Sequence, residues 1–484
     1  MPPDVVIVGG GIAGLATAYE LHRRGIAFQL LERAPRAGGV ILSEEVDGFV
    51  LDGGPDALLI QKPDGVRLCE ELGIGDRLVP TKLPRLAYIQ RGGALHALPA
   101  GSVLGIPTEW APFIRTKLFS WPGKIRMGLE LFVPPRRDDS DESIGSFMSR
   151  RFGREAVTYL AEPLLAGIHA GDVDRLSIRA LFPRFVEAER KQGSLLKAFR
   201  PKPRTRNTKP ATRNPDGAFK SLPGGLSELV RALVKVLPAD SVQLNTTITR
   251  VGGAGPYFVE REDGARLDAR AIVLAAPAFV TSALTREFDA ELSRACGEIP
   301  YASAATVALA FRREQIAHPL NGSGFVVPRV ENAGIMAGSW LSSKWPHRAP
   351  EGSVLLRTFV GGARDPNALE RSDAELVETS LRALGPLLGI SGAPTLTRVF
   401  RWNRANAQHE VGHLDRLAAI ERAVARHPGV YVTGSGFRGT GIPDCVADGR
   451  ATAGQVAEWL AAGASGVPRR SAEGAKADAQ VPSA

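Results

Sequence analysis

Apolar and polar positions near the start of the chain predict a strand, a tight turn, a helix and a second strand. Residues 5–8 (VVIV) are an unbroken run of β-branched residues, which is typical of a strand buried on both faces of a parallel sheet. Residues 13–24 carry helix-forming residues with the apolar ones grouped toward one face, and Gly25 ends that pattern. A second apolar run at residues 28–31 ends at Glu32. The pattern therefore predicts a β-α-β unit at the amino terminus.

The glycines that join the first strand to the helix have the spacing of a dinucleotide-binding turn. Gly9, Gly11 and Gly14 fit G-x-G-x-x-G. The first permits the tight turn, the second lets the backbone approach a pyrophosphate, and the third lets the helix pack close to the strand. The helix N-terminus presents free N–H groups and a positive dipole to the phosphates. Glu32 is placed to accept hydrogen bonds from a ribose diol, which favours NAD or FAD over NADP without separating these two.

Two later segments have the pattern of further parts of the same domain. Residues 221–237 predict a turn followed by an amphipathic helix, and alternating strands follow as far as residue 278. Residues 428–460 predict a strand, a glycine-rich turn and a helix. We expect these segments to complete the nucleotide-binding domain. Two inserts, at roughly residues 86–216 and 300–400, would then supply the substrate site.

The composition is that of a globular protein with two or three domains, since 44% of its 484 residues are hydrophobic and 23% are charged. No apolar run reaches the roughly 20 residues of a membrane-spanning helix, and the N-terminus has no signal-peptide pattern. The three cysteines are far apart in the sequence and lack metal-ligand spacing. They therefore predict a reducing compartment and no metal site.

Charge is unevenly distributed along the chain. The 60 Lys and Arg residues outnumber the 51 Asp and Glu residues, and the net charge of +9 favours anionic partners or serves solubility. Residues 200–220 are basic but hold one aromatic residue, so we expect a solvated loop rather than a nucleic-acid site. Residues 463–484 predict a disordered tail. Residues 110–135 mix Trp and Phe with Arg and Lys, which fits either a helix lying in a membrane interface or an ordinary packing helix.

The segments that follow Glu32 resemble a large flavoprotein family. Residues 32–41 (ERAPRAGGVI) add a glycine pair, and residues 48–58 (GFVLDGGPDAL) add a Gly-Gly-Pro turn, in the order found in amine oxidases and phytoene desaturases. Four further stretches are similar to the protoporphyrinogen oxidase family, and the resemblance covers about residues 4–460. These stretches are residues 92–101, 164–185, 221–229 and 439–452.

This resemblance implies an α/β fold with α+β inserts. It consists of a discontinuous Rossmann-like FAD-binding domain, a substrate-binding domain and a helical membrane-associated domain. The expected bounds are 1–85, 217–299 and 401–462 for the FAD-binding domain, 86–109 and 300–400 for the substrate-binding domain, and 110–216 for the helical domain. The location implied is the cytoplasm or the cytoplasmic face of the cell membrane.

The resemblance also implies the residues that contact cofactor and substrate. The implied FAD contacts are Gly9, Gly10, Gly11, Ile12, Ala13, Gly14, Glu32, Arg33, Gly54, Pro55, Asp56, Ala57, Ile248, Trp402, Ile442, Pro443 and Asp444. The implied substrate contacts are Arg85 to a propionate, Trp345 stacked on a pyrrole ring, Val326 as an apolar wall, and Gly167 and Ile168 through their main chain. The chain departs from the family pattern at Ala87, at His169 and at residues 406–409.

The implied activity is the oxygen-dependent, six-electron oxidation of protoporphyrinogen IX to protoporphyrin IX in haem biosynthesis, with hydrogen peroxide as by-product. Coproporphyrinogen III is the alternative substrate, and a non-catalytic binding protein on the same fold is the alternative of another class. The flavin carries the chemistry, so no catalytic residue is assigned. His169 and His409 are candidates for a base, with a structural role as the alternative. A membrane surface is an expected partner, and a homodimer is left open.

Overall fold

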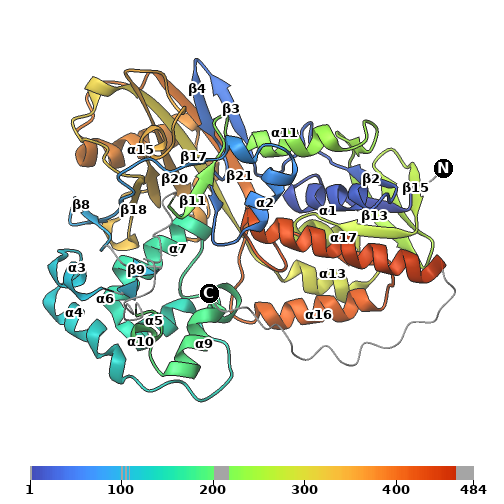
Figure 1. The fold of residues 1–484 in the computed structure, drawn as a ribbon, viewed down its shortest axis with the longest axis horizontal. Helices are drawn as coiled ribbons and strands as arrows, with labels where there is room; N and C mark the ends of the chain where they lie inside the picture. Colours follow the sequence, from blue (N-terminus) through green and yellow to red (C-terminus); the bar gives the residue numbers. More distant parts are fainter. Residues whose placement is uncertain (1–2, 100–101, 104–105, 108, 201–216, 465–484) are drawn as a thin grey trace, which may run out of the picture.

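Five parallel strands form the sheet that carries the glycine turn. The computed structural model describes residues 3–99, 102–103, 106–107, 109–200 and 217–464. The strand order is β12 (Val242–Gln243), β2 (Phe28–Leu31), β1 (Val5–Val8), β16 (Ala271–Leu274) and β22 (Val430–Val432), and every neighbouring pair is parallel. Segments from the start, the middle and the end of the chain therefore lie side by side (Figure 1).

Alternate residues of β1 face two separate apolar layers. Val5 and Ile7 pack in one layer, and Val6 and Val8 pack in the other. The first layer is completed by α1 (Ile12–Arg23), α2 (Asp64–Glu71), α11 (Ser227–Val236) and α17 (Ile442–Ala464). The second is completed by β13 (Ile248–Gly253), β14 (Tyr257–Arg261), β15 (Arg266–Ala269), α12 (Ala278–Leu284), α13 (Ala290–Gly297) and α16 (His413–Ala425). A strand covered on both faces is what its unbroken β-branched sequence predicts.

A second, larger sheet lies beside the first. Its order is β21 (Leu396–Ala407), β17 (Tyr301–Arg312), β20 (Ser353–Gly361), β19 (Ala337–Ser339), β18 (Gly324–Val326), β7 (Ala87–Arg91) and β8 (Ala94–Ala97). Helix α15 (Asp373–Leu388) packs on this sheet, and the hairpin of β3 (Ser43–Val46) and β4 (Phe49–Asp52) joins its other apolar layer. The expected domain boundary at residue 401 falls inside β21, so the larger sheet runs beyond it.

Short helices make up most of the described part of residues 109–200 (Figure 1). They are α3 (Trp110–Arg115), α4 (Trp121–Gly128), α5 (Ile144–Phe152), α6 (Arg154–Ala156), α7 (Glu162–His169), α8 (Ile178–Leu181), α9 (Pro183–Gln192) and α10 (Leu195–Ala198). The remaining strands are β5 (Leu58–Leu59), β6 (Val79–Pro80), β9 (Ser102–Val103), β10 (Ile106–Pro107) and β11 (Phe219–Ser221). The predicted mixed α/β fold is confirmed.

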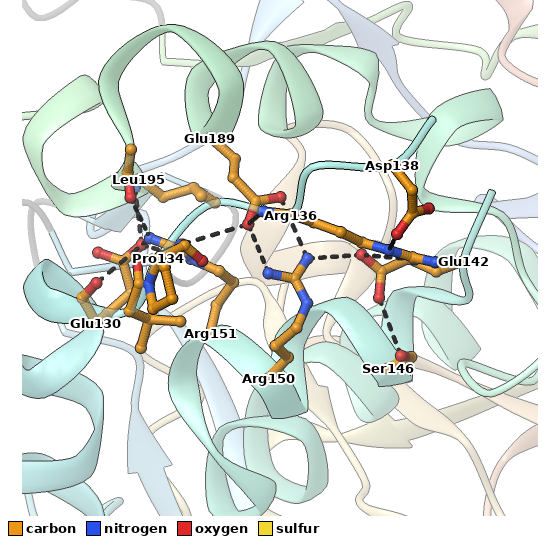
Figure 2. Close-up of polar contacts among 12 residues, drawn as sticks. Glu130, Pro134, Arg136, Asp138, Glu142, Ser146, Arg150, Arg151, Glu189 and Leu195 are labelled. Carbon is orange, nitrogen blue, oxygen red and sulfur yellow. Dashed lines mark hydrogen bonds and ion pairs between the residues drawn. The ribbon is translucent and has the colours of Figure 1, made fainter. Parts of the chain in front are cut away.

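The helical region contains a network of buried charges (Figure 2). Arg151 and Glu130 form an ion pair in which neither side chain is exposed, and the Arg151 Nε donates to Glu130 at 2.8 Å. Glu189 accepts from Arg150 at 2.5 Å and from Arg151 at 3.3 Å, and Arg150 also donates to Glu142 at 2.6 Å. Alternating charges thus cross the space between α5 and α9.

Some expectations concern membrane crossing or parts outside the described residues. In the part of the chain that the structure describes, no helix combines the length and the apolar character needed to cross a membrane. Of the expected solvated loop at 200–220, residues 201–216 lie outside the described residues, whereas Phe219 and Lys220 belong to strand β11. Of the expected tail at 463–484, residues 465–484 lie outside the described residues.

Candidate cofactor and substrate site

The glycine turn between β1 and α1 shows which glycines the protein itself requires. Gly9 has φ of +113°, and a Cβ there would lie 2.7 Å from the Ala275 carbonyl oxygen. A Cβ on Gly14 would overlap the Gly9 carbonyl oxygen. A Cβ on Gly11, in contrast, would meet no atom within 4 Å. Gly9 and Gly14 are therefore fixed by packing, whereas Gly11 borders open space at the N-terminus of α1.

Glu32 lies against this turn, as the sequence predicts. Its carboxylate accepts from the backbone N–H of Gly10 at 2.6 Å and from that of Ala34 at 2.8 Å. The following glycine pair also returns to the turn, because the Gly38 N–H donates to the Gly10 carbonyl oxygen at 2.7 Å. The turn, the acid and the glycine pair thus form one cradle. The side chain of Arg33 is exposed beside it.

The segment that leads into β13 contacts Glu32 through its main chain. The Glu32 N–H donates to Gln243 at 2.8 Å, and the Thr246 N–H donates back to the Glu32 carbonyl oxygen at 2.9 Å. Ile248, two residues later, starts β13 and packs against the second apolar layer. Ile248 is therefore two residues away in sequence from the segment that contacts Glu32.

The C-terminal turn and the start of α17 close the cradle from the other side. Thr17 on α1 donates to the Gly449 carbonyl oxygen on α17 at 3.0 Å, so the two helices are in contact. Ile442 is buried where α17 begins, and its neighbour Asp444 binds the Lys62 ammonium at 2.7 Å. Two helix N-termini, each with free N–H groups and a positive dipole, therefore flank the glycine turn.

The Gly-Gly-Pro turn is fixed by contacts with the larger sheet. A Cβ on Gly54 would overlap the Val40 carbonyl oxygen. The Gly53 carbonyl oxygen accepts from the Trp402 indole N–H at 2.8 Å and from the Thr306 hydroxyl at 2.7 Å. The predicted residue Trp402 thus holds the turn in place by an indole hydrogen bond.

Asp56, in the same turn, does not direct its carboxylate toward the cradle. The carboxylate binds Lys344 at 2.7 Å, the Trp345 indole N–H at 2.7 Å and Arg357 at 3.0 Å. Burial by itself would raise the pKa of Asp56, but Lys344 and Arg357 hold that pKa well below its usual range. The side chain of Asp56 therefore ties the Gly-Gly-Pro turn to the larger-sheet region, and any cofactor contact at this position falls to its main chain.

The structure places the five predicted substrate residues in different surroundings. Gly167 and Val326 lie together, since a Cβ on Gly167 would be 3.2 Å from a Val326 methyl group, and Ile168 beside them is 60% exposed. Trp345 is 0% exposed, so its ring faces the core and the expected stacking on a pyrrole is not supported. The Arg85 Nε donates to the Thr81 main chain and hydroxyl, at 3.1 and 3.0 Å.

Lys62 and its neighbour His169 were not identified as a pair from the sequence. Lys62 follows the Gly-Gly-Pro turn and binds Asp444 across more than three hundred residues of sequence. Burial and the Lys62 ammonium together lower the pKa of His169 to about 4, although Asp444 opposes them. These three groups therefore meet near the start of α17. The only sign of this group in the sequence is a single cation, Lys62, after the Gly-Gly-Pro turn. One cation is too weak a signal to predict a site.

Comparison with known proteins adds a family and close relatives. A model of the flavin-containing amine oxidoreductases matches residues 12–457. A coproporphyrinogen III oxidase of Bacillus subtilis is 36% identical over 94% of this chain and 98% of its own length. A mitochondrial protoporphyrinogen oxidase of Nicotiana tabacum is 28% identical over 94% of this chain and 95% of its own length.

A solved structure shows the same arrangement. It is of a candidate protoporphyrinogen oxidase from Exiguobacterium sp. 255-15, 32% identical, with a TM-score of 0.83 over 94% of this chain and 98% of that one.

Proposed function

This chain belongs to the flavin-containing amine oxidoreductase family and is an FAD-dependent oxidoreductase, and we propose that it oxidises coproporphyrinogen III to coproporphyrin III. The observation that carries the proposal is the identity of 36% to the B. subtilis coproporphyrinogen III oxidase, against 28% to the tobacco protoporphyrinogen oxidase. The resemblance of the sequence alone put protoporphyrinogen IX first. The difference in identity supports the reverse order, with protoporphyrinogen IX as the second candidate.

The residues of the cradle fit FAD. Gly11 leaves open space at the N-terminus of α1, where a pyrophosphate would meet free N–H groups and a positive dipole. The Glu32 carboxylate, now bonded to two backbone N–H groups, is an acceptor for a ribose diol. When bound, FAD accepts hydride from carbon and passes electrons to oxygen with formation of hydrogen peroxide. We therefore assign to the residues of this chain the binding and orientation of cofactor and substrate and the exclusion of water from the site.

The substrate residues suit a wide apolar ring with acidic groups at its rim. Gly167 on α7 and Val326 on β18 pack close together, with little room for a side chain at Gly167. Lys62 binds Asp444, a predicted cofactor residue at the start of α17, and a propionate is a natural partner for its ammonium group. Arg85 is bonded to its own loop, so we propose Lys62 in its place as the residue that pairs with a propionate.

Turnover with the two porphyrinogens tests the proposal. Each is supplied to the purified, yellow holoenzyme in air, and porphyrin fluorescence and hydrogen peroxide are followed together. We expect a kcat/KM at least about 10-fold higher for coproporphyrinogen III, a difference of about 1.4 kcal/mol. A preference for protoporphyrinogen IX would reverse the assignment. A flavin-loaded protein that oxidises neither would favour a binding protein or another oxidase.

We also propose that the surface formed by α3 and α4 and the turn after them contacts a membrane. Its apolar side chains are unusually exposed, at 80% for Phe132, 64% for Trp121 and 62% for Ile125. Arg115 and Lys117 are exposed beside them, which suits an anionic lipid surface. The test is flotation with anionic lipid vesicles. Trp121→Ser combined with Phe132→Ser should abolish flotation, whereas Val330→Ser, at a side chain 62% exposed elsewhere, should not.

A further inference from the structure

Two buried histidines lie side by side beneath the C-terminal turn of the cofactor site. His409 follows β21, and His413 is the first residue of α16. Their rings are stacked, with centroids 3.8 Å apart and planes at 11°. Both side chains are almost wholly buried, at 3% and 1% exposure. Packing two polar rings face to face in a core requires partners for their nitrogens.

Both partners are carbonyl oxygens of the turn that joins β22 to α17. The His409 Nε2 lies 3.1 Å from the Ser435 carbonyl oxygen, and the His413 Nε2 lies 2.9 Å from that of Phe437. A carbonyl oxygen only accepts, so each Nε2 must carry the proton and donate. The two rings therefore hold two peptide groups of one turn by the same kind of bond.

Fixing a carbonyl also fixes the N–H of the same peptide group. The peptide group is planar and trans, so its N–H points away from its C=O. The bond to Ser435 thus directs the Gly436 N–H away from His409, and the bond to Phe437 directs the Arg438 N–H away from His413. Neither N–H has a hydrogen-bond partner among the residues that the structure describes. Both are free to donate to a bound group.

The turn lies where a cofactor of this family meets the protein. It starts at the carboxyl end of β22, the edge at which ligands bind to parallel sheets. A Cβ on Gly434 would be 3.9 Å from the Ala13 methyl group, at the start of α1. The turn therefore belongs to the same cradle as the glycine turn and the start of α17.

The surroundings keep both rings neutral. Burial, together with His413, His169 and Arg416, lowers the pKa of His409 to about 3, although the Ser435 carbonyl opposes them. Burial and Arg416 lower the pKa of His413, against the Phe437 carbonyl and Asp141. The His413 Nδ1 is buried without a hydrogen-bond partner among the described residues, and adding a proton there would bury a charge.

The pair is also attached to the helical region. The Gln408 side chain donates to the His169 carbonyl oxygen at 2.9 Å, at the end of α7. The Ser177 N–H donates to the His409 carbonyl oxygen at 2.9 Å. The histidines therefore sit at the point where the helical region, the larger sheet and the cofactor turn meet.

We propose that His409 and His413 are positioning residues for the flavin: as neutral Nε2 donors they orient the peptide groups after Ser435 and Phe437, so that the Gly436 and Arg438 N–H groups face the cofactor. The inference rests on FAD binding and is independent of which porphyrinogen is oxidised. Donors fixed in this way would strengthen cofactor binding and stabilise negative charge on the bound flavin, which raises its reduction potential.

Leucine and glutamine substitutions distinguish the role of the histidines in orienting the peptide groups from their role in packing. His409→Leu and His413→Leu remove the donor, whereas His409→Gln and His413→Gln retain an N–H that can reach a carbonyl. His318→Leu, at a partly buried histidine in the larger-sheet region, is the matched control. The readouts are the FAD dissociation constant of the apoprotein, from flavin fluorescence, and the midpoint potential of the bound flavin.

We expect each leucine variant to bind FAD about 10-fold more weakly, with a lower midpoint potential. The glutamine variants should stay within about threefold of wild type, and the control should not change. Folded leucine variants with wild-type affinity and potential would overturn the proposal. A loss of porphyrinogen turnover with unchanged flavin values would also overturn this proposal, and it would leave the substrate assignment untouched.

A measurement on the unaltered holoenzyme covers the case in which a leucine variant does not fold. Nitrogen chemical shifts of ¹⁵N-histidine report which ring nitrogen carries the proton, and the glutamine variants assign the signals. We expect both residues as neutral Nε2–H tautomers at pH 7. A charged ring or the Nδ1–H tautomer at either position would overturn the proposal.

Discussion

The parallel sheet and the helical region are stabilised in opposite ways. The strands of the parallel sheet are covered on both faces by apolar side chains, and the first apolar layer continues from α1 to α17. The ion pair that joins these two helices, Arg450 with Glu20, has both side chains partly exposed. The helical region also has an apolar cluster, but it contains a buried ion pair of Arg151 and Glu130, whose side chains are 0% exposed. Figure 2 shows the polar contacts of this pair. A small change in an apolar layer lowers the free energy of unfolding by a small amount. Loss of one partner of a buried ion pair lowers it strongly, because the other charge is left buried and unpaired.

The largest effect is expected from breaking that buried pair. Arg151→Met leaves Glu130 charged and buried, and we expect it to lower the free energy of unfolding by about 3–5 kcal/mol. Arg190→Met, which removes an exposed pair with Asp139, should cost less than about 1 kcal/mol. Urea unfolding followed by tryptophan fluorescence measures both, since Trp110 and Trp121 lie in this region. Similar effects for the two variants would contradict the contrast.

The two regions also differ in how well the sequence predicted them. The β-branched run of β1 and the glycine spacing follow from short-range pattern, and the predicted strand, turn and acid meet in the structure. No pattern of periodicity marks Glu130 as buried, because its partner Arg151 lies on another helix. Charged residues are normally exposed, so pairs of this kind emerge only from the packed structure.

The same limit applied to the substrate side. The resemblance placed Trp345 against a pyrrole and Asp56 against the cofactor, but these two residues bind each other although 289 positions separate them in the sequence. Lys62 was missed because its partner Asp444 comes from the far end of the chain. Motifs identify which segments gather at a site, whereas the direction of a long side chain depends on neighbours that no local motif contains.

A second prediction concerns the cofactor region and should be smaller. Gly14→Ala should destabilise the apoprotein by about 1–3 kcal/mol, because its methyl group would overlap the Gly9 carbonyl oxygen. Gly11→Ala has room within the protein and should leave the Tm of the apoprotein unchanged. It should nevertheless weaken FAD binding, since the methyl group enters the open space beside α1. A lowered apoprotein Tm for Gly11→Ala would show that this glycine serves packing.

The third prediction concerns the effect of pH on stability through the buried histidines. The pKa of His409 is lowered to about 3 and that of His169 to about 4, below the value of about 6.5 in the unfolded chain. The unfolded state therefore binds more protons, and stability falls as the pH drops below about 6.5. Each histidine contributes up to about 1.4 kcal/mol per pH unit. His409→Gln should flatten this slope in unfolding measurements between pH 6.5 and 4.5, and an unchanged slope would contradict the assignment.

The smallest effect is expected at an exposed ion pair in the cofactor region. Lys62 is about half exposed and binds Asp444 at 2.7 Å. Lys62→Met should therefore change the free energy of unfolding by less than about 1 kcal/mol. Compared with Arg151→Met, it shows that burial rather than charge decides the cost. A loss as large as that of Arg151→Met would mean that this pair is shielded from water in solution.

The order of strands in the parallel sheet has a consequence for synthesis of the protein. Val5 pairs with Ala271, and Ile272 in turn pairs with Val430. The sheet cannot close until Val430 has left the ribosome. A domain whose strands are contiguous in sequence can instead fold as it emerges. Pairings this distant in sequence also slow folding. The first strand to be made must therefore wait for the last, and the cofactor cradle is among the final parts of the molecule that synthesis can complete.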